Sequence, residues 1–427
     1  MFKSGYSLLC ILLLSLYSLA QSPTGDTYLL KAGKIFDAEK GVFLTNQAIY
    51  VQGGTIKGVG ANLSVPKGTP EFNVPQATIT PGLIDAHTHL LTVQRLDDNL
   101  ATDALLHSSE YRVLRAAGLA RSYLEAGFTT VRDLGNSGQY LDVEVAKAIN
   151  RGFIPGPRML TSGPIISAMD GQFYQLPFKD QERITKLEYR VVNGAQDAAL
   201  AVKEHANNGV SVIKVVVFGE RMGVSAEEMK AIVQTAHSHR LKVTAHATSD
   251  NDINLALEAG ADGIEHGYYM ADSILEKMAK KGVYLVPTDP STHSIIEVEE
   301  ARHIQKHDTA QIKSMLAPLS DRLKRAQQKG VLIVAGSDAY FEVRSTRGNA
   351  AKQTLIAYLE EGLSPATILQ TATWNAAKAL DLGNQIGALR TGAKADLVIF
   401  NGDLEKDFQK ALFDVKWVIK DGKLVKQ

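Results

Sequence analysis

Two histidines one residue apart, His87 and His89, stand out in the stretch GLIDAHTHL because their type and spacing suit metal chemistry. The apolar run before them predicts a β-strand, and side chains two residues apart on a strand point to the same face. The two imidazoles would therefore project into one space. Neutral imidazoles aimed at one point are typical ligands of a metal ion such as Zn²⁺, which needs further ligands from other segments.

The middle of the chain contains the elements that would position such ligands. Apolar, β-branched strand candidates alternate with amphipathic helix-like runs, a pattern typical of a parallel sheet covered by helices. Eight such units over about 300 residues predict an α/β fold with a closed (β/α)8 TIM barrel. The alternative, an open doubly wound sheet, lacks the Gly-rich phosphate loop after an early strand. The strand candidates are residues 83–90, 129–135, 158–164, 210–218, 242–248, 263–267, 283–288 and 331–339.

Polar residues at the strand ends are informative, because in such a barrel the carboxyl ends of all strands meet at one mouth. Besides the two histidines, Lys214, His246, His266 and Asp338 belong to the fourth, fifth, sixth and eighth strand candidates. Each alone has an ordinary explanation, such as a hydrogen-bonded histidine or an aspartate that caps the next helix. Their occurrence together in one barrel predicts a metal centre.

The composition narrows the classes of function. The chain has 427 residues and a formal net charge of zero, so no basic excess indicates nucleic-acid binding. Its 45% hydrophobic and 22% charged residues are ordinary for a globular protein. The single cysteine, Cys10, lies near the N-terminus, which leaves the rest of the chain without a disulfide, a thiolate nucleophile or a cysteine–zinc site.

The N-terminus has the features of a secretory signal peptide. Lys3 precedes an apolar run over residues 8–19, and the small residues Ser18 and Ala20 predict cleavage after Ala20. A membrane anchor needs roughly 20 apolar residues, and this run is shorter. We therefore expect residues 1–20 to be a signal peptide and the mature protein to be secreted or periplasmic, with no membrane association after cleavage.

Both ends of the chain beyond the signal segment favour antiparallel β-structure. Alternating apolar residues and the turn Gly53-Gly54 predict strands near the N-terminus, and ADLVIF with VKWVIKDGKLV predicts a hairpin that turns at Asp421-Gly422. We expect residues 21–80 and 384–427 to form one small β-sandwich domain. The barrel would then occupy residues 81–383.

Several motifs resemble those of the amidohydrolase superfamily: DAHTHL, the lysine of VIKVVVF, AHA, EHG and GSDA. PGLID before them and GALRTGAKADLV after them extend the resemblance over the whole mature chain. Within the superfamily the chain is similar to the imidazolonepropionase-related group, which includes metal-dependent Xaa-Pro dipeptidases. The resemblance implies a (β/α)8 barrel with a β-sandwich built from both chain ends, and a binuclear metal-dependent hydrolase of C–N bonds.

The resemblance also implies the ligands of two divalent metal ions such as Zn²⁺. His87, His89 and Asp338 would hold one ion, and His246 and His266 would hold the second. Histidine and carboxylate ligands also suit Mn, Fe or Co, so the residues do not select one metal.

Two further roles follow from the same resemblance. Lys214 would bridge both ions as a carboxylated lysine formed with CO2, since a carbamate is an anionic ligand and a plain buried ammonium would be costly. Its apolar neighbours VI and VV disfavour snorkelling to solvent. A bridging hydroxide would attack the substrate, and Asp338 would be the catalytic residue that moves its proton to the leaving amine.

Substrate contacts are expected in the loops after the strands. Tyr268 follows EHG and Gln172 lies in AMDGQFYQ, and each could contact substrate or only line the pocket. Dipeptidase-like relatives often have a histidine near Gln172 and another at the position of Arg347, and this chain has neither. Arg344 and Arg347 could bind a substrate carboxylate or be solvated loop charges.

The other histidines have structural explanations. His237 and His239 form a second HxH, but on a predicted helix, where residues i and i+2 point in different directions. His303 and His307 have helical spacing without the glutamate of an HExxH motif, which favours a solvated helix face.

Three functional hypotheses remain in competition. The first is a binuclear amidohydrolase that cleaves an amide or peptide bond of a small molecule or dipeptide, in the manner of an Xaa-Pro dipeptidase. The second is a hydrolase of cyclic amides, lactones or esters with the same centre. The third is a barrel that only binds its ligand, which a missing metal ligand would favour. Homo-oligomers are common among enzymes, and the sequence neither favours nor excludes one.

Overall fold

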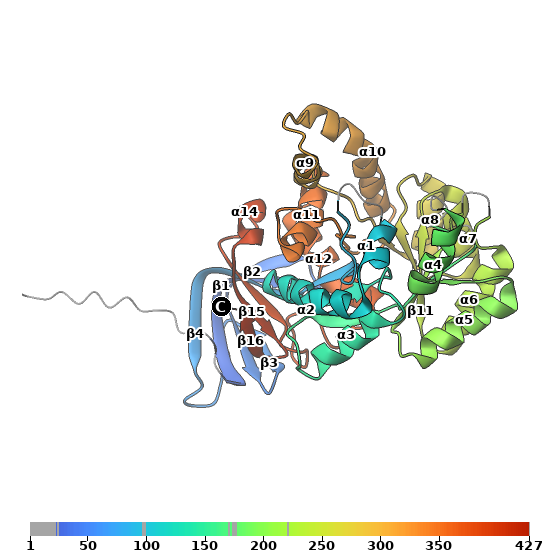
Figure 1. The fold of residues 1–427 in the computed structure, drawn as a ribbon. Helices are drawn as coiled ribbons and strands as arrows, with labels where there is room; N and C mark the ends of the chain where they lie inside the picture. Colours follow the sequence, from blue (N-terminus) through green and yellow to red (C-terminus); the bar gives the residue numbers. More distant parts are fainter. Residues whose placement is uncertain are drawn as a thin grey trace, which may run out of the picture.

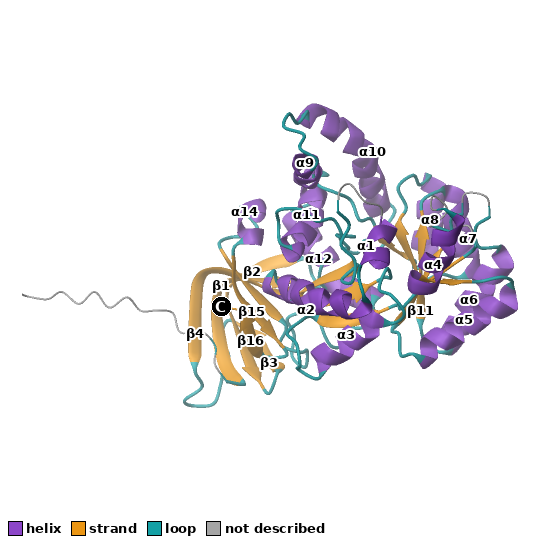
Figure 2. Cartoon of the chain, viewed as in Figure 1, coloured by secondary structure: helices purple, strands orange, loops and turns teal. Residues whose placement is uncertain are grey.

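The computed structural model describes Pro23 and residues 25–95, 100–169, 171–172, 177–219 and 222–426. The predicted signal peptide, residues 1–20, lies outside the described residues. Figures 1 and 2 show a region of strands at one end of the molecule and a mixed region of strands and helices at the other. Within the described ranges, no helix combines the length and the apolar character needed to cross a membrane.

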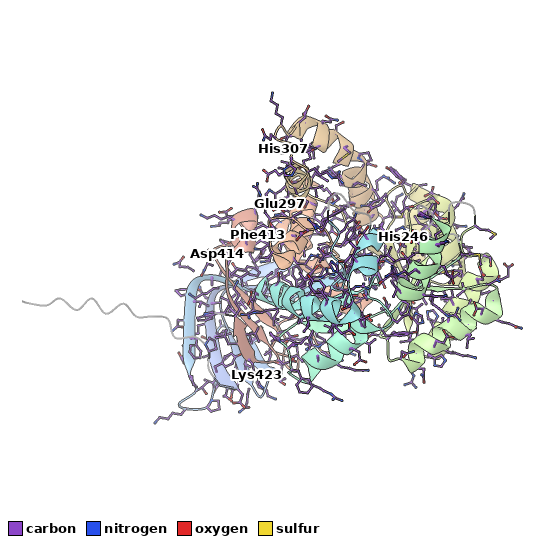
Figure 3. The ribbon with its side chains drawn as sticks, in the orientation of Figure 1. His246, Glu297, His307, Phe413, Asp414 and Lys423 are labelled. Carbon is purple, nitrogen blue, oxygen red and sulfur yellow. The ribbon has the colours of Figure 1, made fainter. Side chains whose placement is uncertain are left out.

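The two ends of the chain form one seven-stranded sheet in the order β16-β15-β14-β4-β1-β2-β3. The C-terminal strand β14 pairs antiparallel with β4, and β4 pairs parallel with β1. A separate sheet domain built from both chain ends is therefore confirmed, whereas a sandwich of two sheets stays a prediction. Lys423, labelled in Figure 3, lies on the last strand of this sheet, β16. The strands are β1 (Thr27–Asp37), β2 (Val42–Gln52), β3 (Thr55–Gly60), β4 (Glu71–Pro81), β14 (Leu397–Asn401), β15 (Val415–Lys420) and β16 (Lys423–Lys426).

Both predicted hairpin turns of this sheet are confirmed. Gly53 and Gly54, with φ of 58° and 73°, join β2 to β3, and Asp421 and Gly422, with φ of 48° and 78°, join β15 to β16. Two-residue hairpins whose twist matches their strands need a positive φ at both central positions. Glycine and aspartate tolerate that backbone region, which is why these turns can be recognised in the sequence.

The middle of the chain forms parallel sheets of the TIM-barrel type, with helices outside them. A three-stranded sheet has the order β5-β6-β7, and a six-stranded sheet has the order β13-β12-β11-β10-β8-β9. Every pairing within both sheets is parallel. The strands are β5 (Leu83–Thr88), β6 (Phe128–Asp133), β7 (Arg158–Thr161), β8 (Ile165–Ser167), β9 (Tyr189–Val191), β10 (Val212–Val216), β11 (Lys242–Ala247), β12 (Gly263–His266) and β13 (Tyr284–Val286).

The eighth strand candidate, residues 331–339, is not a regular strand. Ile333 forms an isolated parallel bridge with Leu285 of β13, and Ala339 forms one with Thr88 of β5. Asp338 has a left-handed backbone with φ of 50°, which interrupts the extended geometry that a continuous ladder needs. The two parallel sheets are thus not joined by a regular strand, and a closed barrel stays a prediction.

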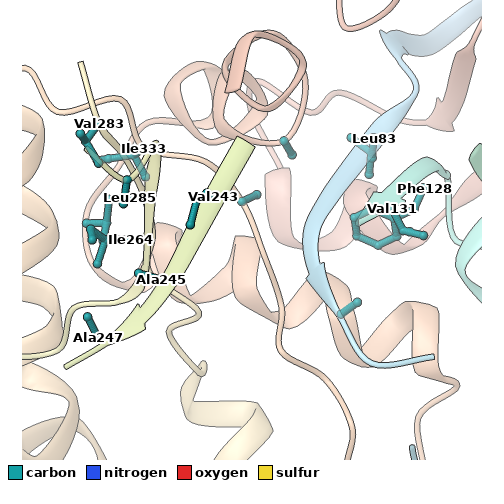
Figure 4. Close-up of a cluster of buried hydrophobic side chains, with 14 of the residues drawn as sticks. Leu83, Phe128, Val131, Val243, Ala245, Ala247, Ile264, Val283, Leu285 and Ile333 are labelled. Carbon is teal, nitrogen blue, oxygen red and sulfur yellow. The ribbon is translucent and has the colours of Figure 1, made fainter. Parts of the chain in front are cut away.

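The apolar core explains how the strands present their side chains. On β11, Val243, Ala245 and Ala247 are buried among apolar residues of neighbouring strands (Figure 4). Because side chains alternate along a strand, Thr244 and His246 point to the opposite face of β11. The same alternation that builds the core therefore directs His246 away from it.

Helices flank these sheets (Figure 1). Residues 289–320 contain α9 and most of α10, and the described residues of 165–195 contain β8, α4 and β9. The helices are α1 (Leu100–Leu106), α2 (Ser109–Glu125), α3 (Leu141–Asn150), α4 (Phe178–Glu188), α5 (Ala195–Asn207), α6 (Ala226–Ser238), α7 (Asp250–Ala259), α8 (Asp272–Lys281), α9 (Thr292–Ala301), α10 (Thr309–Gln328), α11 (Arg347–Glu360), α12 (Pro365–Thr371), α13 (Trp374–Ala379) and α14 (Phe408–Phe413).

Candidate metal centre

The two histidines at the end of β5 have one ring nitrogen each held by the protein. Nδ1 of His87 donates to Oε2 of Glu265 across 2.7 Å, and Nδ1 of His89 donates to the carbonyl of Gly135 across 2.7 Å. These bonds fix both imidazoles in the tautomer whose Nε2 carries a free lone pair. This arrangement is typical of metal-binding histidines, whose second nitrogen is held by a carboxylate or a carbonyl.

Asp338 completes a compact group with these histidines. Its Oδ1 lies 3.1 Å from Nε2 of His89 and 3.6 Å from Nε2 of His87. One ligand atom from each of the three residues lies within 4.8 Å of the others. The backbone amide of Asp338 also donates to the carbonyl of His87 across 2.8 Å, so the two chain segments are held together. The three residues could share one cation.

His246 and His266, from the ends of β11 and β12, lie beside this group. Their ring centroids are 4.4 Å apart, and the ring of His266 lies 5.1 Å from that of His87. Nδ1 of His266 is 2.8 Å from the hydroxyl of Thr288 and 4.0 Å from Oδ2 of Asp338. Figure 3 labels His246 among the strands and helices of the parallel sheets.

Lys214 of β10 is buried against the histidines. Only 2% of the residue is exposed, and Nζ lies 3.5 Å from Nε2 of His87. Burial lowers the pKa of Lys214 to about 8, against smaller opposing effects of Glu265 and Asp338. The structure thus brings together all six predicted ligand residues, from both parallel sheets and the 331–339 segment.

The same burial keeps most of these imidazoles neutral. Burial, and after it the charge of Lys214, lower the pKa of His87 to about 4 and that of His246 to about 3. The pKa of His266 falls well below its usual value for the same reason. Burial also acts on His89, but the hydrogen bond and charge of Asp338 outweigh it and raise the pKa. Neutral imidazoles are the form that binds metals.

Glu265 and Arg132 support the centre from inside the sheets, and sequence reasoning missed both. Arg132 donates to Oε1 of Glu265 across 2.7 Å and to the hydroxyl of Tyr284 across 2.7 Å, while Thr244 donates a short bond to the same carboxylate. Both charged residues are fully buried. Arg132 and Glu265 are charged residues within apolar strand segments, and a buried charge needs a partner of opposite charge. This sequence feature could have identified both residues.

Comparison with known proteins assigns the chain to a family. The Amidohydrolase family profile matches residues 78–425, which is most of the chain. The protein belongs to the amidohydrolase family. It is therefore an enzyme that acts on carbon–nitrogen bonds, and its family is metal-dependent.

Relatives of this amidohydrolase span nearly its whole length. Ochratoxinase of Aspergillus niger is 29% identical over 96% of this chain and 88% of its own, and imidazolonepropionase of Brevibacillus brevis is 25% identical over 88% and 89%. Among solved structures, an Xaa-Pro dipeptidase with bound methionine is 27% identical, with a TM-score of 0.79 over 94% of this chain and 100% of its own. A prolidase complexed with N-methylphosphonate-L-proline is 26% identical, with a TM-score of 0.80 over 94% and 100%.

The backbone of the amidohydrolase is unusual at three residues of the centre. His266, Thr288 and Asp338 have φ of 70°, 56° and 50°, a region that non-glycine residues rarely adopt. Each such residue costs roughly 1–3 kcal/mol, and they are typical of functional sites. Gly336 is required nearby, because a Cβ there would lie 2.8 Å from Cβ of His87 and 2.4 Å from a methyl of Val286.

Both predicted substrate-contact residues lie at the centre of this amidohydrolase. The hydroxyl of Tyr268 is 3.2 Å from Nδ1 of His266 and 3.4 Å from the hydroxyl of Thr288. The amide of Gln172 donates to Nδ1 of His246 across 3.5 Å, and Gln172 is exposed. Both side chains therefore contact predicted metal-binding residues, His266 and His246, directly.

Arg347 of this amidohydrolase was predicted to bind a substrate carboxylate or to be a solvated loop charge, and both predictions are wrong. Arg347 is buried, and its guanidinium donates to the backbone carbonyls of His89, Thr92, Ala339 and Tyr340. It joins the chain after β5 to the chain after Asp338, so its role is structural. Arg344 is largely exposed and pairs with Glu300 across 3.2 Å, as expected of a loop charge.

The remaining histidines of the amidohydrolase form no metal site with the described residues. His237 lies in the last turn of α6 and pairs with Asp262, which agrees with the expectation of a surface residue. The prediction of one helix face for His303 and His307 is wrong, because α9 ends at Ala301 and both follow it. His307 instead contacts Glu299 across 2.7 Å.

Proposed function

We propose that the protein is a binuclear amidohydrolase that cleaves an amide or peptide C–N bond of a small substrate such as a dipeptide, in the manner of an Xaa-Pro dipeptidase. The observation that carries the proposal is the gathering of four histidines, one buried lysine and one aspartate around a single point. The likeness to an Xaa-Pro dipeptidase and a prolidase, at 27% and 26% identity, supports the substrate class.

The residues fit two divalent cations, with Zn²⁺ the simplest choice. His87 and His89 offer Nε2 because their Nδ1 atoms are bonded, and His266 offers Nε2 because its Nδ1 bonds Thr288, whose own hydroxyl donates to a carbonyl. Asp338 offers an anionic oxygen beside them. When bound, such ions would polarise the scissile carbonyl and lower the pKa of a water molecule.

We also propose that Lys214 is carboxylated. A buried ammonium 3.5 Å from His87 would repel cations, whereas a carbamate would supply two anionic oxygens. Lowering its pKa to about 8 from the ordinary 10.5 increases the fraction of the neutral amine that the reaction requires. The amine nitrogen forms a bond to the carbon of CO2 and releases one proton, which leaves an anionic carbamate.

Asp338 would move the proton of the reaction. Burial raises the pKa of Asp338, but His87, His89 and Lys214 outweigh burial and hold it below its usual value, so the carboxylate is ionised at neutral pH. It can accept a proton from the attacking water and return that proton to the leaving amine nitrogen. Tyr268, beside His266, and Gln172, beside His246, would contact the substrate.

Three further proposals concern the frame of the enzyme. The hydrogen bonds of residues 331–339 to both β13 and β5 support closure of the two parallel sheets into one (β/α)8 barrel. Domain boundaries at residues 21–80 with 384–427, and at 81–383, agree with the seven-stranded sheet. The apolar N-terminus supports export with cleavage after Ala20.

A second candidate function is hydrolysis of a cyclic amide, lactone or ester. The cavity beside Asp338 has a volume of about 250 Å³, below the ~300–1,000 Å³ of most ligand pockets, which favours a compact substrate. A barrel that only binds its ligand is disfavoured, because none of the six predicted ligands is missing.

The test is a substrate panel with the purified, metal-supplemented protein. It contains Xaa-Pro and other dipeptides, N-acyl amino acids, cyclic amides and lactones, with the Asp338→Asn variant as the control. We expect turnover of at least one C–N substrate, and a loss of about 100-fold or more in kcat with Asp338→Asn. Inactivity on every amide, or unchanged turnover by the variant, would reject the proposal.

A further inference from the structure

A cavity of about 250 Å³ opens beside Asp338 and Tyr268. Its walls come from α9, from the segment after Asp338 and from α11, and include Ile295, Glu297, Tyr340 and Phe341. Because Asp338 belongs to the candidate centre, a group in this cavity would lie next to the bond that is cleaved. The chemistry of the walls therefore bears on which substrates are accepted.

Glu297 gives this cavity a negative charge. The residue is only 9% exposed, and its Oε1 accepts from the hydroxyl of Ser345 across 2.6 Å, with Nε2 of His293 3.9 Å from the same oxygen. Among the described residues, no hydrogen bond to Oε2 is found. Because Glu297 lines the cavity, a cationic substrate group there could donate a charge-assisted hydrogen bond to this carboxylate. Figure 3 labels Glu297 on α9.

The rest of the cavity suits a cation rather than an anion. No lysine or arginine is among its described lining residues. Tyr340 and Phe341 have ring centroids 4.7 Å apart, and Tyr268 contributes a third aromatic ring. Aromatic faces attract ammonium and guanidinium groups, and a carboxylate beside them adds charge-assisted hydrogen bonds.

We propose that this cavity selects substrates with a cationic side chain, a guanidinium or an ammonium, and that Glu297 binds it. The inference rests on the proposed function, since it names the substrate class of the same centre. The small volume of the cavity supports this proposal, because the cavity can hold one flexible side chain but not a large ring system. The favoured substrates would be amides or dipeptides that contain arginine or lysine.

The competing explanation is that Glu297 only anchors Ser345. In that case the charge of a substrate side chain would have no effect on turnover, and loss of Glu297 would impair all substrates alike. Arginine and citrulline separate the two explanations, because their side chains have nearly the same shape and differ in charge.

The experiment compares two matched pairs of dipeptides with the metal-loaded full chain: Ala-Arg against Ala-citrulline, and Arg-Ala against citrulline-Ala. We expect kcat/KM to favour the arginine peptide by about 10-fold to 100-fold in at least one pair. Glu297→Gln should reduce that preference to within about 3-fold, through a larger fall in kcat/KM for the arginine peptide than for the citrulline peptide. Glu300→Gln, on the same helix but outside the cavity lining, should leave the preference unchanged.

The wild-type comparison needs no variant, so the proposal stays testable if Glu297→Gln does not fold. Equal kcat/KM within both pairs, or a preference that survives in folded Glu297→Gln, would overturn it. Cleavage of other amides but of none of these four peptides would overturn it as well, with the proposed function intact. Inactivity towards every amide would instead overturn the proposed function together with this inference.

Discussion

Oε2 of Glu265 lies 2.7 Å from Nδ1 of His87, inside the parallel sheets, while Oε1 of the same carboxylate is 2.7 Å from a guanidinium nitrogen of Arg132. Burial would raise the pKa of Glu265, but Arg132 and His87 outweigh it and lower the pKa to about 2. The carboxylate is thus ionised, and it orients His87 so that Nε2 faces Asp338.

Glu265→Gln should weaken metal binding without removing a ligand. Glutamine keeps an oxygen for His87 but loses the charge, and loss of such a supporting partner typically lowers metal affinity 10-fold to 100-fold. Competition with a chelator measures the affinity. Glu258→Gln on the surface of α7, where Glu258 pairs with Lys277, is the matched control. A folded Glu265→Gln protein with wild-type metal affinity would refute this role.

Arg322→Lys should impair both stability and catalysis. Arg322 is fully buried on α10, donates to the carbonyls of His266 and Gly267 and to both oxygens of Asp289, and lies over the ring of Tyr268. Lysine keeps the charge but cannot reproduce the planar fork.

We expect Arg322→Lys to lose about 3 kcal/mol in the free energy of unfolding, and kcat/KM to fall at least 10-fold below the melting range. Arg325→Lys, three residues later and only partly buried on the same helix, should change both far less. Chemical unfolding and steady-state kinetics on both variants provide the readouts. Normal kinetics in Arg322→Lys would show that the contact with the His266 loop does not position the centre.

Glu361→Gln should change the pH dependence of stability. Burial, and then the charge of Asp289, raise the pKa of Glu361 to about 9 from an ordinary value of 4.5, so the folded protein holds a proton that the unfolded chain releases. This contribution is complete below about pH 4.5 and is lost as the pH rises through about 9, with a slope of up to ~1.4 kcal/mol per pH unit.

Glutamine mimics the protonated acid and does not titrate. The wild-type protein should therefore lose stability relative to Glu361→Gln as the pH is raised from 5 to 9, as measured by denaturant unfolding at each pH. A difference between the two proteins that is constant with pH would mean that Glu361 is ionised in the fold.

The carbamate on Lys214 should be detectable directly. Protein reconstituted with metal in ¹³C-labelled bicarbonate should show one carbamate carbon resonance, which Lys214→Ala lacks. Reconstitution in CO2-free buffer should give lower activity that bicarbonate restores. Lys242, at the start of β11 and paired with Asp381, is the control: Lys242→Ala should keep the resonance. Full activity without any carbamate signal would exclude this ligand.

Much of the fold follows from local patterns that the sequence displays. The hairpin turns Gly53-Gly54 and Asp421-Gly422 need a positive φ, and the residues present tolerate it. The alternation of side chains along β11, with Val243 buried in the core and His246 on the opposite face, can also be predicted from the sequence. The six predicted ligand residues could be named because the strand ends of the predicted parallel barrel would meet at one mouth.

Other features depend on contacts between distant segments. Arg132 and Glu265 are 133 residues apart, and the sequence around each does not indicate that the two form an ion pair. Arg322 donates a hydrogen bond to the carbonyl of His266, 56 residues earlier, and the helical pattern around Arg322 does not predict this contact. The left-handed backbone of Asp338 breaks a segment that VLIVAGSDA predicts as a strand, because tertiary contacts there override local propensity.

Metal content of the active, purified enzyme tests the central claim most directly. Elemental analysis should find two equivalents of a divalent transition metal per chain, and dialysis against a chelator should remove the metal and the activity in parallel, with recovery on adding Zn²⁺ or Mn²⁺. A fully active preparation that contains no such metal would contradict the account.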